Sequence, residues 1–166
     1  MIKSIISLFF LTLSAPVLCQ GTAEFLAKAT PGFLEIEGKG AEVIGKAVVG
    51  KDTMISGTFK VDLRKLSTGI DLRDEHMRDN YLDVKQFPEA VFVLDPVLFA
   101  AGTHKKFSGT LTLHGVKKKI SGIVDFEPTK ANAQFEIDLT AFGIKVPTYK
   151  ILTVGKEVEI KVGIPI

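Results

Sequence analysis

Apolar and polar residues alternate with a period of two along much of the chain. Segments 58–64, 110–113, 135–139 and 158–162 each place an apolar residue at every second position. Because side chains of a strand point alternately to the two faces of a sheet, each segment predicts a strand with one buried face and one solvated face. One-sided strands are typical of antiparallel sheets, since parallel strands are covered on both faces and look apolar throughout.

Turn-forming residues separate these strands at short intervals. Strands at this density, without helical segments between them, predict a single all-β domain built as a sandwich or a barrel. The chain shows no linker, low-complexity tract or internal repeat. The turn signals are Pro31-Gly32, Gly38 to Gly40, Gly50 to Asp52, Gly102, His114-Gly115 and Gly155.

One segment, residues 71–81, breaks the alternation. Asp71 is a suitable N-cap and acidic residues follow it in the first turn, which predicts a short helix. Leu72, His76 and Met77 can share one face of that helix. The helix should end well before Pro88, because the residue before a proline avoids helical geometry. A helix this short is not stable alone, so we expect it to dock across one mouth of a barrel.

The first residues have the layout of an export signal. A lone Lys3 precedes an apolar run, Ile5 to Leu13, which is too short for the ~20 residues that cross a bilayer. Cleavage after Cys19 would divide the chain into a signal peptide, residues 1–19, and a barrel domain, residues 20–166. A lipid anchor on Cys19 is the alternative, but that chemistry prefers a residue smaller than Leu18 before the cysteine.

Removal of residues 1–19 leaves a nearly neutral chain without cysteine. Its 20 basic and 19 acidic residues give a net charge of +1, so it has no general electrostatic attraction to nucleic acid. Cys19 is the one cysteine of the sequence. Its loss excludes disulfides, thiolate catalysis and cysteine metal sites together.

The sequence contains no recognisable catalytic or metal-binding motif. His76 lies near Asp74 and Asp79, but at these offsets the side chains do not converge on one metal. His114 is expected in a hairpin turn and His104 in solvent. No serine has a nucleophile-elbow context and no glycine-rich loop precedes a helix. We therefore expect a protein that is not an enzyme and that uses no cofactor.

Two lysine clusters, residues 105–106 and 117–119, look like one basic patch in the linear sequence. A hairpin that pairs Leu113 near Lys118 would place the two clusters roughly 23 Å apart along the strand. We expect two solvated strand ends and not one binding surface.

The apolar interior is the remaining candidate site. The chain has twelve phenylalanines and no tryptophan, and the alternation places a large apolar face inside the sheet. Side chains can fill that space, or a closed barrel can leave room for an apolar ligand. Composition does not choose between them, and the residues alone favour a filled core. The inward set is Phe59, Val61, Leu63, Leu111, Leu113, Phe135, Ile137, Leu139, Val158 and Ile160.

Two segments resemble the signatures of the YceI-like proteins. Residues 56–92 match a pattern of a Thr-Gly turn, Arg-Asp-x-His-hydrophobic, a Leu-Asp-Val segment and a Pro-x-x-x-Phe step. Residues 107–122 are similar to the second signature, a Gly-x-Leu-Thr-x-His-Gly-Val hairpin. The first pattern falls on Thr68, Gly69, Arg73, Asp74, His76, Met77, Leu82, Pro88 and Phe92.

This resemblance implies an eight-stranded antiparallel, lipocalin-like barrel with one short helix, located in the bacterial periplasm or secreted. It also implies a polyisoprenoid or similar long lipid in the lumen, which reverses the preference for a filled core. Residues 29–49 depart from the family's usual pattern, which suggests a remodelled entrance.

We therefore interpret the chain as a binding protein whose inward set contacts the lipid. Arg73 and His76 would meet an anionic or hydroxyl head group. Their structural alternatives are pairing of Arg73 with Asp74 or Glu89 and packing of His76 onto the barrel.

The expected partner is a long-chain isoprenoid or another amphiphilic lipid, with transient membrane contact, no nucleic acid, and a homodimer left open. The alternative function is an envelope scaffold or a partner-binding module with a filled barrel.

Export can be tested by the intact mass of protein purified from its native host. The chain should start at Gln20 or within about two residues of it, because the apolar run and its polar boundary define the cleavage region. A diacylglyceryl group on Cys19 would contradict this and would tether the protein to a membrane.

Overall fold

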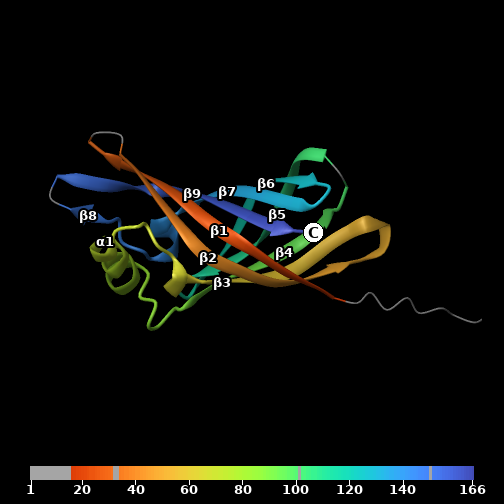
Figure 1. Ribbon diagram of the computed structural model, residues 1–166, viewed down its shortest axis with the longest axis horizontal. Coiled ribbons are helices and arrows are strands. Elements are labelled where there is room, and N and C mark those ends of the chain that lie inside the picture. Colours follow the sequence, from red (N-terminus) through yellow and green to blue (C-terminus); the bar gives the residue numbers. More distant parts are fainter. Residues whose placement is uncertain (1–15, 32–33, 101, 150) are drawn as a thin grey trace, which may run out of the picture.

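The computed structural model describes residues 16–31, 34–100, 102–149 and 151–166. In these residues one antiparallel sheet follows the order β1 to β7, then β9 and β8, and β1 also pairs with β9. That pairing closes the eight long strands into a barrel (Figure 1), so the expected architecture is confirmed. The eight are β1 (Val17–Thr30), β2 (Leu34–Val49), β3 (Met54–Asp62), β4 (Glu89–Leu98), β5 (Gly102–Leu113), β6 (Val116–Glu127), β7 (Lys130–Asp138) and β9 (Leu152–Pro165).

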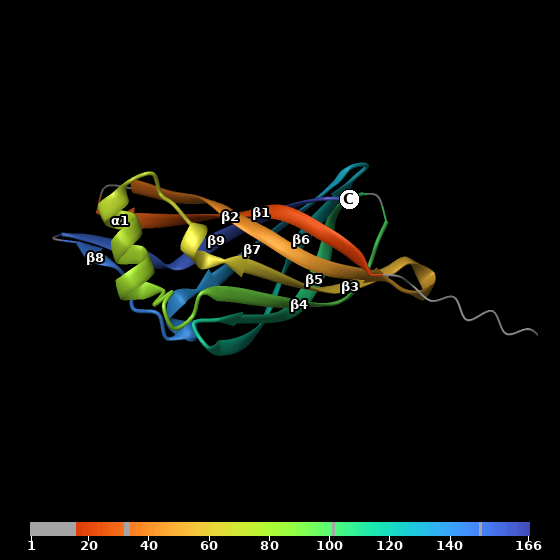
Figure 2. The ribbon, with the colours of Figure 1, turned by 60° about the horizontal axis from the view of Figure 1, so that its bottom comes forward.

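Short elements lie mostly at one end of the barrel. The two-residue strand β8 (Thr148–Tyr149) pairs with β9 at that end, beside helix α1 (Asp71–His76) and the π-helical turn η3 (Met77–Tyr81) that continues it. Figure 2 shows α1 across the same end as β8 and the β1–β2 hairpin. The expected docking of the helix at one barrel mouth is confirmed.

Two of the expected strands end earlier than the alternation predicts, for the same local reason. Leu63 begins the 3₁₀ turn η2 (Leu63–Lys65), because the Asp62 carboxylate accepts a hydrogen bond from the Arg64 N–H at 3.0 Å. Leu139 begins η4 (Leu139–Phe142), where Asp138 accepts from the Thr140 N–H at 2.8 Å. Side-chain capping therefore competes with continuation of the strand. The Thr140 and Lys156 hydrogen bonds lower the pKa of Asp138 to about 2.

The helix begins one position earlier than a cap at Asp71 would give. Ile70 is the N-cap, without a side-chain hydrogen bond, and Asp71 is the first helical residue. The carboxylate that organises this region is Asp74, which is buried and binds the loop before the helix. The expected helical range was correct, but the expected cap was wrong.

The β5–β6 hairpin has a tighter turn than expected. His114 and Gly115 form a two-residue turn with φ of 50° and 75°, a geometry that favours glycine at the second position. Leu113 consequently pairs with Val116, and Lys118 pairs with Leu111 instead of lying near Leu113. His114 is therefore a turn residue, as expected, and its ring packs against Phe87 with the ring centroids 4.7 Å apart.

The two lysine clusters lie apart on this hairpin. Lys105 pairs with Val124, whereas Lys117 pairs with Thr112 close to the turn. Lys105 and Lys117 are thus seven residues apart along the hairpin, which corresponds to roughly 23 Å. The expectation of two separate, solvated groups is confirmed.

Strand β1 includes the last residues of the expected export signal. Val17 pairs with Ala47 and Cys19 with Gly45, while residues 1–15 lie outside the described residues. Cleavage after Cys19 would shorten β1 by these first positions. In the described part of the chain, no helix has the length and apolarity needed to span a bilayer.

Candidate functional site

The barrel encloses a cavity of about 670 Å³. Inward residues of all eight long strands line it, and α1 lies over one end. The lining is almost entirely apolar, as the alternation along the strands requires. The filled core that the residues alone favoured is therefore not what the structure shows.

Small side chains on two neighbouring strands explain the empty space. β1 contributes Ala23, Ala27 and Ala29 to the cavity wall, and β2 contributes Ala47, all of them buried. An eight-stranded barrel is just wide enough for its inward side chains to fill it, so methyl groups along one wall leave volume unfilled. Cys19 belongs to the same wall, and burial raises the pKa of its thiol.

Three phenylalanines line the cavity from three other strands. Phe92 and Phe107 lie 5.9 Å apart with nearly perpendicular rings, and Phe135 lies 6.3 Å from Phe92 and 6.1 Å from Phe107. Phe107 meets the other two rings edge to face, and Phe92 and Phe135 are nearly parallel; both are favoured arrangements of aromatic pairs. The cavity lining thus combines small alanine side chains with a cluster of three phenylalanine rings in mutual contact.

Every residue that the sequence suggested for the lumen lies on this cavity. The two polar candidates, Arg73 and His76, lie at the α1 end, and His76 is exposed there. The apolar candidates on the cavity wall are Phe59, Val61, Leu63, Leu111, Leu113, Phe135, Ile137, Leu139, Val158 and Ile160.

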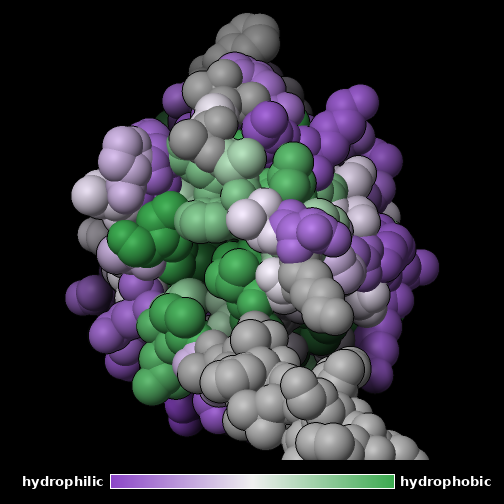
Figure 3. Space-filling view, turned by 90° about the vertical axis from the view of Figure 1, so that its right-hand side faces the viewer, coloured by the Kyte–Doolittle hydropathy of each residue, from purple (hydrophilic) through white to green (hydrophobic). Residues whose placement is uncertain are grey.

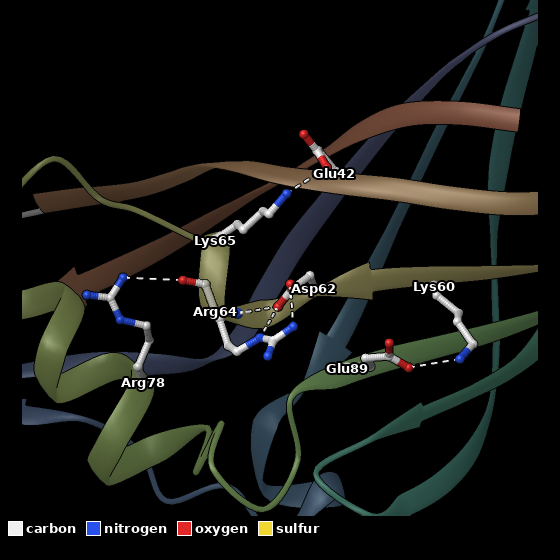
Figure 4. A network of polar contacts seen from close by, with 7 residues as sticks. All are labelled: Glu42, Lys60, Asp62, Arg64, Lys65, Arg78 and Glu89. Atoms are coloured by element: carbon white, nitrogen blue, oxygen red, sulfur yellow. Dashed lines mark hydrogen bonds and ion pairs between the residues drawn. The ribbon is translucent and has the colours of Figure 1, made fainter.

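Arg73 is held by the loop before the helix and not by a carboxylate. Its Nε donates to the Thr68 hydroxyl at 2.8 Å and a terminal guanidinium nitrogen donates to the Thr68 carbonyl at 3.0 Å. The expected alternative, pairing with Asp74 or Glu89, is wrong: Asp74 binds Ser67 and Thr68, and Glu89 accepts from Lys60 at 2.9 Å (Figure 4). Among the described residues Arg73 forms no ion pair, so its charge is available at the mouth.

Asp74 holds Thr68 in the position from which Thr68 binds Arg73. It is 4% exposed and accepts from the Ser67 hydroxyl at 2.6 Å, the Thr68 N–H at 2.7 Å and the Thr68 hydroxyl. Burial by itself raises its pKa, but the hydrogen bonds from Ser67 and Thr68 hold the pKa below its ordinary value. Because the Thr68 hydroxyl donates to Asp74, its oxygen is free to accept from Arg73.

Further polar contacts brace the same end of the barrel. Arg78, on η3, donates to the Arg64 carbonyl at 3.5 Å and to the Leu66 carbonyl at 3.4 Å. Figure 4 shows this contact beside the Lys65–Glu42 pair, which joins η2 to β2 at 2.8 Å. These contacts tie the helical segment to the barrel wall.

Three polar mouth residues were not predicted: Thr68, Tyr81 and Thr148 also line the cavity at the α1 end. Thr68 lies in the Thr-Gly turn of the family signature, which marks its position, but Thr148 has no comparable signal. The residues described by the structure contain no group of three or more metal-binding side chains.

The fold and site together define an antiparallel barrel with an apolar cavity and polar side chains at one end of it. A sequence model of the YceI-like domain matches residues 20–165, so the chain belongs to the YceI-like family.

Sequence relatives and solved structures agree with this assignment. A UPF0312 protein of Pseudomonas putida strain W619 is 32% identical over an alignment of 100 residues that covers 54% of this chain and 52% of that protein. This chain thus spans about half the length of the curated relatives that it matches.

Two solved structures share the fold. BcnA of Burkholderia cenocepacia has a TM-score of 0.70 at 18% identity, covering 87% of this chain and 96% of that one. A polyisoprenoid binding domain from Saccharophagus degradans has a TM-score of 0.60 at 15% identity, covering 89% and 97%.

Asp74→Asn should destabilise the protein near neutral pH by about 1–3 kcal/mol, because the buried carboxylate loses charge-assisted hydrogen bonds. Folding lowers the pKa of Asp74. The carboxylate therefore stabilises the fold at any pH above its ordinary pKa of 3.8, and this stabilisation is lost as the pH falls through the folded-state pKa. Urea unfolding at a series of pH values should therefore show that the free energies of unfolding of the wild type and of Asp74→Asn become equal in acid. Asp71→Asn, an exposed change on the same helix, is the control, and an equal loss there would contradict the assignment.

Leu111 tests whether the cavity persists in solution. It is buried on the cavity wall, between Thr110 and Thr112. Leu111→Ala should cost less than the roughly 2–5 kcal/mol of a filled core, and Leu111→Phe less than about 1–3 kcal/mol, because space adjoins the side chain. Denaturant unfolding of delipidated protein measures both. If both variants lose as much free energy of unfolding as expected for a filled core, the interior is closed in solution.

Proposed function

We propose that this protein is an exported binding protein that holds a polyisoprenoid or a similar long-chain lipid in its barrel. The apolar cavity of about 670 Å³ is the observation that carries the proposal. It falls within the roughly 300–1,000 Å³ of ligand pockets, and the few polar groups at one end suit a ligand with one polar terminus. The similarity to a polyisoprenoid binding domain adds support.

Binding would draw its affinity and its selectivity from different parts of the site. Each methylene buried against the apolar wall contributes about 0.8 kcal/mol before the cost of ordering the chain. Arg73 supplies charge at the mouth, and its remaining N–H donors suit a phosphate or another anionic head group. His76, exposed beside it, adds a ring N–H that can donate a hydrogen bond to the same head group.

Export to the bacterial periplasm or beyond is part of the proposal. The family match begins at residue 20, directly after the expected cleavage point, which supports a mature chain starting there. The alternative of a scaffold with a filled barrel has less support, because the barrel is hollow.

The direct test is extraction of lipid from protein purified from its native envelope, followed by mass spectrometry. A reproducible prenyl or fatty species at about one per chain is the expected result. Protein that is repeatedly free of lipid and does not take up prenyl phosphates in titrations would contradict the function.

Arg73→Ala and His76→Ala should weaken binding of a prenyl monophosphate more than binding of its neutral alcohol. The loss of selectivity should be about tenfold for Arg73, because a charge-assisted hydrogen bond is removed. Arg78→Ala is the matched control, because Arg78 does not line the cavity and its side chain binds the backbone carbonyls of Arg64 and Leu66. Equal losses for both ligands, with a lower melting temperature, would show that Arg73 and His76 only hold the helix.

A further inference from the structure

Polar groups are distributed unevenly along the cavity. The polar side chains at its α1 end are Thr68, Arg73, His76, Tyr81 and Thr148. Elsewhere on the described wall, the one charged residue is Glu24, exposed on β1 opposite Lys161. One end of the cavity can therefore bind a polar head group, and the rest suits hydrocarbon.

The opposite end of the cavity is apolar up to the surface. It ends among inward residues of six strands and at the last residue of the chain, Ile166, which lines the cavity and is 47% exposed. Figure 3 looks onto this end and shows apolar side chains around a hollow. The residues here that the proposed mature chain retains are Ala47, Ile55, Val97, Phe126, Ala131, Ile164 and Ile166.

Exposed apolar residues continue this surface outside the cavity. Val49 and Leu98 are the last residues of β2 and β4, and both are exposed. Val49 pairs with Ile55, and Val97, next to Leu98, also pairs with Ile55, so all of them surround the same opening. With Ile166 they form an apolar rim, defined here as Val49, Leu98 and Ile166.

We propose that the cavity is a tunnel with two unlike openings, which binds single-headed amphiphiles of long chain length in one direction. This rests on the proposed function and deepens it. The head group lies at Arg73 and the tail runs past the phenylalanines to the second opening. A tail longer than the barrel passes out over the apolar rim, so the barrel sets no upper limit on chain length.

The length of the barrel makes the absence of an upper limit on chain length measurable. At about 3.4 Å per residue, the 14 residues of β9 extend roughly 45 Å along the strand, and strand tilt makes the barrel axis shorter. A closed cup of that length would reject longer chains, because overpacking of a fixed cavity is unfavourable. A tunnel accepts them.

The first experiment titrates the delipidated full chain with farnesyl, geranylgeranyl and solanesyl monophosphates in one detergent. The expected result is that solanesyl phosphate binds at least as tightly as geranylgeranyl phosphate. Tight binding of the shorter chains with solanesyl phosphate weaker by about tenfold or more would overturn the tunnel and leave the lipid-binding function standing. Failure of all three to bind would overturn the function itself.

The second experiment closes the far opening. Ala47→Phe places a ring at that end of the cavity wall. It should weaken the affinity for solanesyl phosphate roughly tenfold or more, and change the affinity for farnesyl phosphate by about twofold or less. Val97→Phe is a second closure from another strand, for use if the first variant does not fold. Ala29→Phe, the same change at the α1 end, should weaken both ligands alike. A uniform effect of the closing variants on both chain lengths would overturn the proposal.

Discussion

Closure of the sheet by the β1–β9 pairing is the constraint on which the rest of the molecule depends. It removes both edges of the sheet and forces every second side chain of eight strands into one enclosed space. The total size of those side chains then decides between a core and a cavity. Ala23, Ala27 and Ala29 lie on β1, one of the two strands that make this closure, so the same element seals the barrel and leaves it hollow.

At the polar end of the barrel, a few hydrogen bonds both anchor the helix and orient Arg73. Asp74 is buried in a helix too short to be stable alone, and its hydrogen bonds to Ser67 and Thr68 join that helix to the preceding loop. Thr68 then orients Arg73 without neutralising it. A carboxylate in direct contact with Arg73 would have competed with any anionic ligand. Because Asp74 contacts Arg73 only through the Thr68 hydroxyl, the helix stays anchored to the loop and the Arg73 charge is not neutralised.

The period of two in the sequence predicted an antiparallel all-β domain and the facing of the apolar candidates, and its interruption at residues 71–81 predicted the helix. The choice of an eight-stranded barrel followed from the resemblance to the YceI-like proteins. It misjudged details that depend on single side chains, such as the capping by Asp62 and Asp138 that ends β3 and β7. It could not predict the cavity from its residues alone, because alanine gives a weak apolar signal and the space depends on strands meeting across the barrel. The position of Arg73 at the mouth followed from the helix predicted over residues 71–81 and its docking at a barrel mouth, whereas its contacts with Thr68 required the folded loop.

The division of the cavity into a polar mouth and an apolar remainder has an energetic consequence. Contacts with the hydrocarbon chain grow with its length but discriminate little between lipids, because each added methylene contributes about the same amount. Discrimination must come from the few groups that meet the head, where an unpaired charge or donor costs more than a missing methylene. Aliphatic and aromatic walls such as Phe92 and Phe135 therefore permit a range of chains. Under the proposed function, the Thr68–Arg73–Asp74 arrangement would restrict that range by head group.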